Sequence, residues 1–170
     1  MKNISFRNDV LPLKNVLYRL ALRITMSRED AEDIVQDTLI RVWNRRDDWD
    51  DISSIEAFSL TVCRNLSLDK IRKAGNGDTP ISEEEAGEPD SGRDPYERIM
   101  QRDRVEQVRR IVDSLPEKQK SCMQLRDFEG KSYKEIAKVL GITEEQVKVN
   151  IFRARQAVKL KFNEIDKYGL

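Results

Sequence analysis

Residues 132–162 carry the side chains whose types and spacing most clearly suggest a chemical role. The segments SYKE (132–135) and TEEQ (143–146) each show a capping-box pattern that starts a helix, and Gly141 stands between them. Two helices joined by so short a turn must cross steeply, which is the helix-turn-helix geometry. The sequence therefore predicts a DNA-binding helix-turn-helix, with a plain helical hairpin as the alternative.

The second helix of such a motif places its N-terminal part in the major groove of DNA. Arg153 can then pair bidentately with a guanine, Gln146 can read an adenine, and Val149 can pack on a thymine methyl group. The neighbouring basic side chains are suited to phosphates. The predicted DNA-contacting residues are Gln146, Lys148, Val149, Asn150, Arg153 and Arg155. For each one alone, the alternative is a solvated helix face.

The residue types also exclude several chemistries. The chain has no histidine, so imidazole catalysis and histidine-ligated metals are ruled out. Cys63 and Cys122 lie far apart without a CxxC motif, which rules out a zinc site and favours two buried thiols. The acidic run 47–51 is not a metal-binding motif. We therefore predict no catalytic residue, no metal and no cofactor.

The elements that position these residues follow from composition. The 170 residues are 36% charged and only 6% aromatic, which favours small helical units over one large core. The charge is segmented: the net charge is +1 over residues 1–75, −6 over residues 76–95 and +5 over residues 96–170. The middle segment is rich in Gly, Pro, Ser and Glu, so we predict a flexible acidic linker between two domains.

Helical periodicity runs through both predicted domains, so the expected fold is all-α. In the first domain, apolar residues recur from Val10 to Ile24, and Ser27 is a plausible N-cap for the next helix. We expect that helix to bury Ala31, Ile34, Val35, Leu39, Val42 and Trp43. A polar loop, residues 45–54, precedes a third helix, residues 55–73, which carries a narrow polar stripe of Thr61, Asn65 and Arg72. Further helices are expected over residues 96–115 and from Pro116, its first helical position, to about residue 128.

The run SLPEKQKSCMQLRDFEGKSYKEIAKVLGITEEQVKVNIFRARQAVK (114–159) closely resembles the domain of bacterial sigma factors that binds the promoter −35 element. DAEDIVQDTLIRVW (30–43) is similar to their core-polymerase-docking helix, and FSLTVCRNLSLDKIRK (58–73) to their −10 recognition helix. Only these two domains are recognisable. The arrangement resembles the extracytoplasmic-function (ECF) group of the sigma-70 family.

The resemblance implies a role for each part of the chain. The second helix would bind the clamp of the largest polymerase subunit through Asp33, Gln36, Asp37 and Arg41. The third helix and the loop before it would hold the melted −10 element, through Thr61, Arg64, Asn65, Arg72, Asp51 and Ser53. In that loop, Trp49 is expected to pack inside rather than stack on a base. Core RNA polymerase, promoter DNA and an anti-sigma factor are the expected partners.

Two other functions remain open from the sequence. One is a stand-alone transcription regulator with an N-terminal sensor domain, and the other is a helical adaptor that binds proteins through acidic surfaces. No run of 18 apolar residues and no signal-peptide core is present, so we predict a cytoplasmic protein without membrane insertion.

Overall fold

The structure is a computed structural model that describes residues 3–75 and 95–168. Within these two ranges every regular element is helical, which confirms the all-α prediction. The predicted linker lies outside the described residues except for Pro95, which begins α4. We refer to residues 3–75 as the N-terminal half and to residues 95–168 as the C-terminal half.

The N-terminal half is a bundle of three helices, α1 (Lys14–Thr25), α2 (Arg28–Asn44) and α3 (Ile55–Ala74). The predicted N-cap is confirmed, because the Ser27 side chain accepts a hydrogen bond from the backbone N–H of Asp30. Ser54 caps α3 in the same way. Short π- and 3-10-helical turns, Phe6–Val10 and Leu11–Leu13, precede α1, and a 3-10 turn, Arg46–Asp51, lies between α2 and α3.

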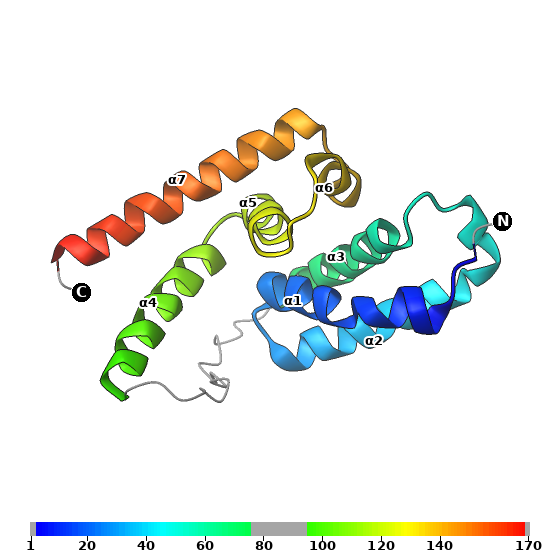
Figure 1. The fold of residues 1–170 in the computed structure, drawn as a ribbon, viewed down its shortest axis with the longest axis horizontal. Helices are drawn as coiled ribbons and strands as arrows, with labels where there is room; N and C mark the ends of the chain where they lie inside the picture. The colour runs from blue at the N-terminus through cyan, green and yellow to red at the C-terminus, as the bar shows by residue number, and fades with distance from the viewer. Residues whose placement is uncertain (1–2, 76–94, 169–170) are drawn as a thin grey trace.

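The C-terminal half contains α4 (Pro95–Asp113), α5 (Glu117–Met123), a π-helical turn (Gln124–Phe128), α6 (Tyr133–Leu140) and α7 (Glu144–Tyr168). Figure 1 shows α7 as a long rod along one edge of the molecule, with the short α6 crossing its beginning steeply. The expected capping box at the start of α7 has both of its bonds. At the start of α6 the Ser132 hydroxyl accepts from the Glu135 backbone N–H and donates to the Glu135 carboxylate, so only the Ser132 cap of the expected box is present.

Three details differ from the sequence-based expectations. The periodic segment that begins at Val10 is not one helix. A 3-10 turn, Leu11–Leu13, with Pro12 as its second residue, precedes α1. Pro116 is the N-cap of α5 rather than its first helical residue. The prediction that Trp43 is buried is wrong, because Trp43 is 44% exposed. It lies in the last turn of α2, where it packs edge-on against the rings of Phe6 and Trp49.

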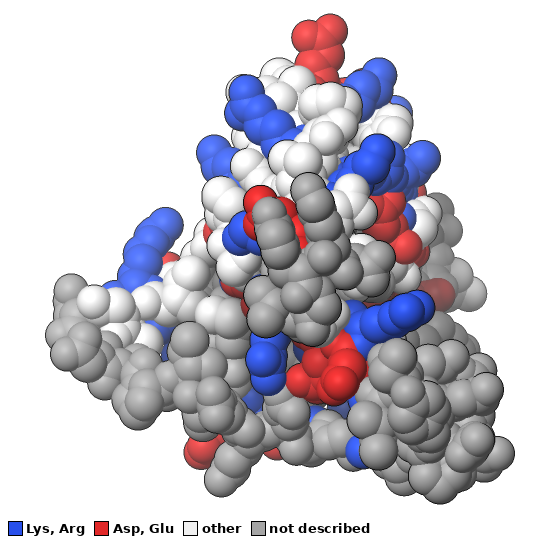
Figure 2. Space-filling view, turned by 90° about the vertical axis from the view of Figure 1, so that its left-hand side faces the viewer, with Lys and Arg blue, Asp and Glu red and all other residues white. Residues whose placement is uncertain are grey.

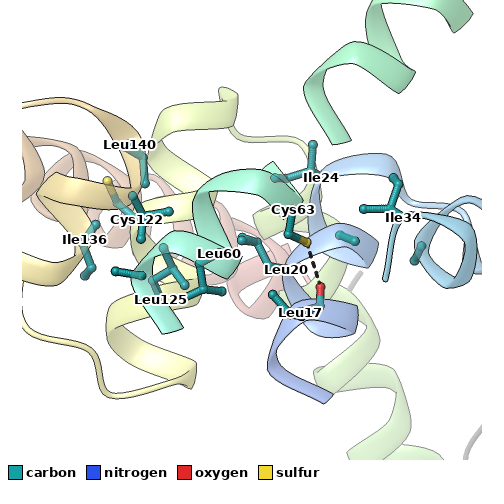
Figure 3. Close-up of a cluster of buried hydrophobic side chains, with 14 of the residues drawn as sticks. Leu17, Leu20, Ile24, Ile34, Leu60, Cys63, Cys122, Leu125, Ile136 and Leu140 are labelled. Carbon is teal, nitrogen blue, oxygen red and sulfur yellow. Dashed lines mark hydrogen bonds between the residues drawn. The ribbon is translucent and has the colours of Figure 1, made fainter. Parts of the chain in front are cut away.

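The two halves share one hydrophobic core, which the sequence did not predict. Figure 3 shows Leu60 of α3 beside Leu125, with Cys122, Ile136 and Leu140 of the C-terminal half in the same cluster. In Figure 1, α1 and α3 face α5 and α6. The residues of this cluster are fully or almost fully buried, so burial of apolar surface holds the two halves together. We call this arrangement the closed form.

Candidate nucleic-acid interface

The turn between α6 and α7 has the local geometry of a helix-turn-helix. Gly141 ends α6 with φ at +67°, a left-handed conformation that favours glycine. The backbone N–H of Thr143 donates to the Gln146 side chain at 2.9 Å, and the Gln146 N–H donates to the Thr143 hydroxyl at 3.1 Å. Val147 and Ile151 are buried and fix α7 against the rest of the half. One face of α7 is therefore presented to solvent.

The predicted −35-binding residues lie on α7 at or near this solvent face. Lys148 and Arg153 are exposed, Val149 is 44% exposed, and Asn150 is half-buried. Arg153 makes no ion pair or hydrogen bond with another described residue, so its guanidinium is available to a ligand. Lys148 places its ammonium group 5.5 Å from the ring centroid of Tyr133.

Two of the predicted contacts are already occupied by neighbouring groups. The side-chain amide oxygen of Gln146 accepts the capping bond from the Thr143 backbone N–H. The backbone carbonyl of Gln146 accepts a hydrogen bond from the Asn150 side-chain amide at 2.8 Å. Bidentate reading of adenine needs that amide oxygen, so the cap competes with the role expected of Gln146. The Arg155 guanidinium forms an ion pair with Asp127, with Nε at 3.0 Å from Oδ2. Of the three predicted base or phosphate contacts Gln146, Arg153 and Arg155, Arg153 therefore has the most available side chain.

The predicted −10-binding residues divide into exposed and occupied groups. Asp51, Asn65 and Arg72 are exposed, and Arg72 has only a long contact of 3.8 Å with Asp69. The Thr61 hydroxyl donates to the Ala57 carbonyl at 2.8 Å. The exposed Ser53 hydroxyl accepts from Lys138 of α6 at 3.1 Å. The polar stripe of α3 thus reaches solvent mainly through Asn65 and Arg72.

Arg64 is placed differently from the other predicted −10 residues. Its side chain is 9% exposed and forms a bidentate ion pair with Glu117 of α5, with both N–O distances at 2.8 Å. Burial would raise the pKa of Glu117, but hydrogen bonds from Arg64 and Ser121, together with nearby positive charges, outweigh it and lower that pKa. In the closed form, Arg64 is therefore not accessible to DNA.

The predicted polymerase-docking face of α2 is fully accessible. Asp33, Gln36, Asp37 and Arg41 are all exposed. Next to them lies a shallow apolar pocket of about 310 Å³, lined by Phe6, Leu39, Ile40 and Trp43. Arg46 stacks over the Trp43 ring at 4.6 Å from its centroid. An apolar pocket beside a row of polar side chains is a typical protein-docking surface.

Sequence reasoning missed three exposed apolar side chains at these surfaces. Ile40 is 57% exposed beside the polar residues of α2, and Phe152 and Leu160 are each 63% exposed on α7. Their helical spacing relative to the buried stripe was the available signal, since each falls outside it.

Figure 2 shows Lys and Arg side chains on both sides of the upper part of the molecule rather than in one patch. Among the described helices, none has the length and apolar character needed to cross a membrane.

The chain matches the family models of two sigma-70 regions. Residues 10–76 match "Sigma-70 region 2" and residues 105–158 match "Sigma-70, region 4". The chain is 32% identical over 154 residues to the ECF RNA polymerase sigma factor SigL of Mycobacterium tuberculosis, covering 88% of this chain and 84% of that protein. It is 31% identical over 144 residues to the ECF RNA polymerase sigma factor SigE of Mycolicibacterium smegmatis, covering 84% of this chain and 56% of that longer protein.

A solved structure shares the fold. The sigma factor RpoE from Bartonella quintana, in complex with the anti-sigma factor NepR, superimposes with a TM-score of 0.75 over 93% of this chain and 96% of that one, at 24% identity. The sequence matches extend over both halves, in the same order as in these sigma factors. The chain therefore belongs to the ECF group of the sigma-70 family, the subunits that direct RNA polymerase to promoters.

Proposed function

We propose that the two halves act as separate contact units, with residues 1–75 binding core polymerase and the −10 element and residues 96–170 binding the −35 element, joined by residues 76–95. The observation that carries this proposal is the exposure of Arg153 on a capped helix-turn-helix while the polar face of α2 is exposed on the other half. One chain thus presents a DNA-reading surface and a protein-docking surface together.

The polymerase contact is assigned to Asp33, Gln36, Asp37 and Arg41. They lie outward on a helix that begins with a firm N-cap and packs its other side into the core. The apolar pocket formed with Ile40 and Trp43 supplies the hydrophobic part of the same surface. A polar row beside an apolar anchor fits a protein partner better than nucleic acid, because two of the four polar residues are acidic and repel phosphates.

The −35 contact is assigned to the exposed face of α7. Arg153 reads a base edge, Val149 adds an apolar contact, and Lys148, Asn150 and Arg155 position the helix on the phosphate backbone. Gln146 contributes chiefly by capping α7, which keeps its N-terminal turn ordered for entry into the groove.

The −10 contact is assigned to the polar stripe of α3 and the preceding turn. Thr61, Asn65 and Arg72 follow one side of α3, and Asp51 and Ser53 lie at the turn before it. Carboxylate and hydroxyl oxygens can accept hydrogen bonds from the exocyclic amines of unstacked bases. Arg64 joins this surface once the C-terminal half has moved away from it.

The chain itself performs no catalysis in this proposal, and it acts in the cytoplasm together with the polymerase. An anti-sigma factor is a further proposed partner, because the RpoE structure with the same fold was solved with one.

The polymerase contact is tested by holoenzyme assembly with charge-reversed variants. Asp33→Lys and Asp37→Lys should weaken co-elution with purified core polymerase at least about tenfold, because a reversed charge would face a like charge across the interface, and like charges brought together there cost several kcal/mol. Glu164→Lys, which makes the same charge reversal at an exposed position on α7, is the matched control and should assemble normally. Normal assembly of both reversed variants would refute the assignment of this face.

A further inference from the structure

Three of the four ion pairs between the described parts of the two halves share one direction of charge, and the fourth, between Lys131 of the C-terminal half and Glu56 of α3, has the opposite direction. Arginines of the N-terminal half meet carboxylates of the C-terminal half in three pairs, namely Arg19 with Glu129, Arg23 with Asp113 and Arg64 with Glu117. Residues 96–170 carry a net charge of +5, so this acidic face runs against the overall charge of its own half. Each of these arginines is therefore neutralised by a carboxylate, as it would be by an anionic ligand.

The pair between Arg64 and Glu117 is the most completely formed of the three. The two side chains are 9% and 19% exposed, whereas Arg19 in its pair is 48% exposed. Two guanidinium nitrogens of Arg64, Nε and Nη2, donate in parallel to the two carboxylate oxygens of Glu117. Arginine binds a phosphate through the same pair of parallel hydrogen bonds. The Ser121 hydroxyl donates to Glu117 at 2.8 Å and holds the carboxylate in position.

We propose that Glu117 is an autoinhibitory latch: in the closed form it occupies Arg64, so that single-stranded DNA reaches Arg64 only when the two halves separate. The inference rests on the proposed function for the placement of Arg64 at the −10 strand. Glu117 and a DNA phosphate compete for one guanidinium, and binding of one excludes the other.

The latch acts together with the shared apolar core. Separation of the halves exposes buried aliphatic side chains such as Leu60, Leu125 and Ile136, so the open form is the minor state of the free protein. When the binding-competent state is a small fraction of the molecules, the apparent dissociation constant equals the intrinsic one divided by that fraction. Any change that weakens the closed form then tightens apparent DNA binding by an equal factor.

The test compares two charge-neutralising variants of the full chain. Glu117→Gln removes the latch and leaves Arg64 buried without its counter-ion. An uncompensated buried charge strongly destabilises the closed form. Glu164→Gln makes the same change of net charge on the exposed face of α7 and is the matched control. Fluorescence anisotropy with a labelled single-stranded DNA oligonucleotide should show at least about tenfold tighter binding for Glu117→Gln than for Glu164→Gln.

Two further variants keep the test decisive if Glu117→Gln folds poorly. Ser121→Ala keeps every charge but loosens the Glu117 carboxylate, so it should tighten binding in the same direction by a smaller factor. The double variant Arg64→Gln/Glu117→Gln should lose the gain in DNA affinity shown by Glu117→Gln, because it lacks the Arg64 side chain that Glu117→Gln would free. Equal affinities for Glu117→Gln and Glu164→Gln, with no gain from Ser121→Ala, would overturn the latch.

This result is separable from the outcome of the polymerase experiment. The anisotropy assay contains no polymerase and needs no promoter sequence. A protein that fails to assemble with core polymerase but shows the Glu117→Gln gain refutes the proposed function and keeps the latch. A protein that assembles normally but shows no gain refutes the latch alone. Small-angle X-ray scattering of Glu117→Gln should also show a larger radius of gyration than the control.

Discussion

The indole N–H of Trp49 donates a hydrogen bond to the backbone carbonyl of Val42, with Nε1 and O separated by 3.0 Å in a buried site. This bond ties the 3-10 turn before α3 to the last turn of α2. The turn that carries Asp51, a residue proposed to contact the −10 element, is therefore anchored to the helix proposed to dock on polymerase. The packing expected for Trp49 is confirmed, since its side chain is 7% exposed.

Trp49→Phe should lower the free energy of unfolding by about 1 kcal/mol, because the Val42 carbonyl loses the indole N–H and keeps the longer 3.2 Å bond from the Arg45 backbone N–H. Urea denaturation followed by circular dichroism measures this change. Trp43→Phe is the matched control, since Trp43 is 44% exposed, and it should change the free energy of unfolding by about 0.5 kcal/mol or less. Equal losses for the two variants would contradict the anchoring role of Trp49.

Arg153→Ala should cost about 1–3 kcal/mol of discrimination between −35 sequences, because we propose that its exposed guanidinium reads a base edge. Lys159→Ala should instead weaken binding to all sequences to a similar extent, since an exposed lysine farther along the helix meets only phosphates. Holoenzyme binding to a panel of promoter variants separates the two effects. A uniform loss for Arg153→Ala would show that it does not read bases.

The Arg64–Glu117 pair should make stability depend on acid pH. Because the folded-state pKa of Glu117 is lowered from 4.5, its contribution is present above pH 4.5 and is lost as the pH falls through the lower folded value. At pH 7, Glu117→Gln should therefore unfold at a lower temperature than the wild type, by the equivalent of about 2 kcal/mol. Thermal melts from pH 7 to pH 3 should show this difference shrink, and a constant difference would argue against the pair.

Both cysteines should resist thiol reagents in the folded protein. Burial raises the pKa of the Cys63 and Cys122 thiols to about 12, so almost no thiolate forms at pH 8, and neither sulfur is exposed. The Cys63 thiol also donates to the Leu17 carbonyl, as Figure 3 shows. Reaction with Ellman's reagent should be slow until urea unfolds the chain, and rapid labelling of either cysteine in buffer would contradict this burial.

The sequence predicted local structure well because its signals are local. The Ser27 and Thr143 caps, the Gly141 turn and the buried stripe of α7 all follow from spacing within a few residues. Trp43 was misplaced because periodicity assigns a side chain to a face of a helix but does not show whether another element covers that face at the helix end. The rings of Phe6 and Trp49 and the Arg46 guanidinium contact Trp43 but leave its side chain 44% exposed.

The contact between the halves could not be predicted from the sequence. Arg64 and Glu117 are 53 residues apart, on opposite sides of a segment without apolar pattern. Nothing in the type of either residue distinguishes an interdomain ion pair from a solvated side chain. The site residues were therefore found as candidates, but the occupation of Arg64, Gln146 and Arg155 by neighbouring groups became visible only in three dimensions.

Run-off transcription with purified core RNA polymerase tests the central claim most directly. A genomic library of promoter fragments, transcribed with core polymerase plus this chain, should give discrete transcripts that are absent with core polymerase alone. Those transcripts should disappear with the Asp33→Lys/Asp37→Lys variant. Formation of no holoenzyme and no chain-dependent transcript, with a folded protein, would contradict the assignment as a promoter-directing sigma factor.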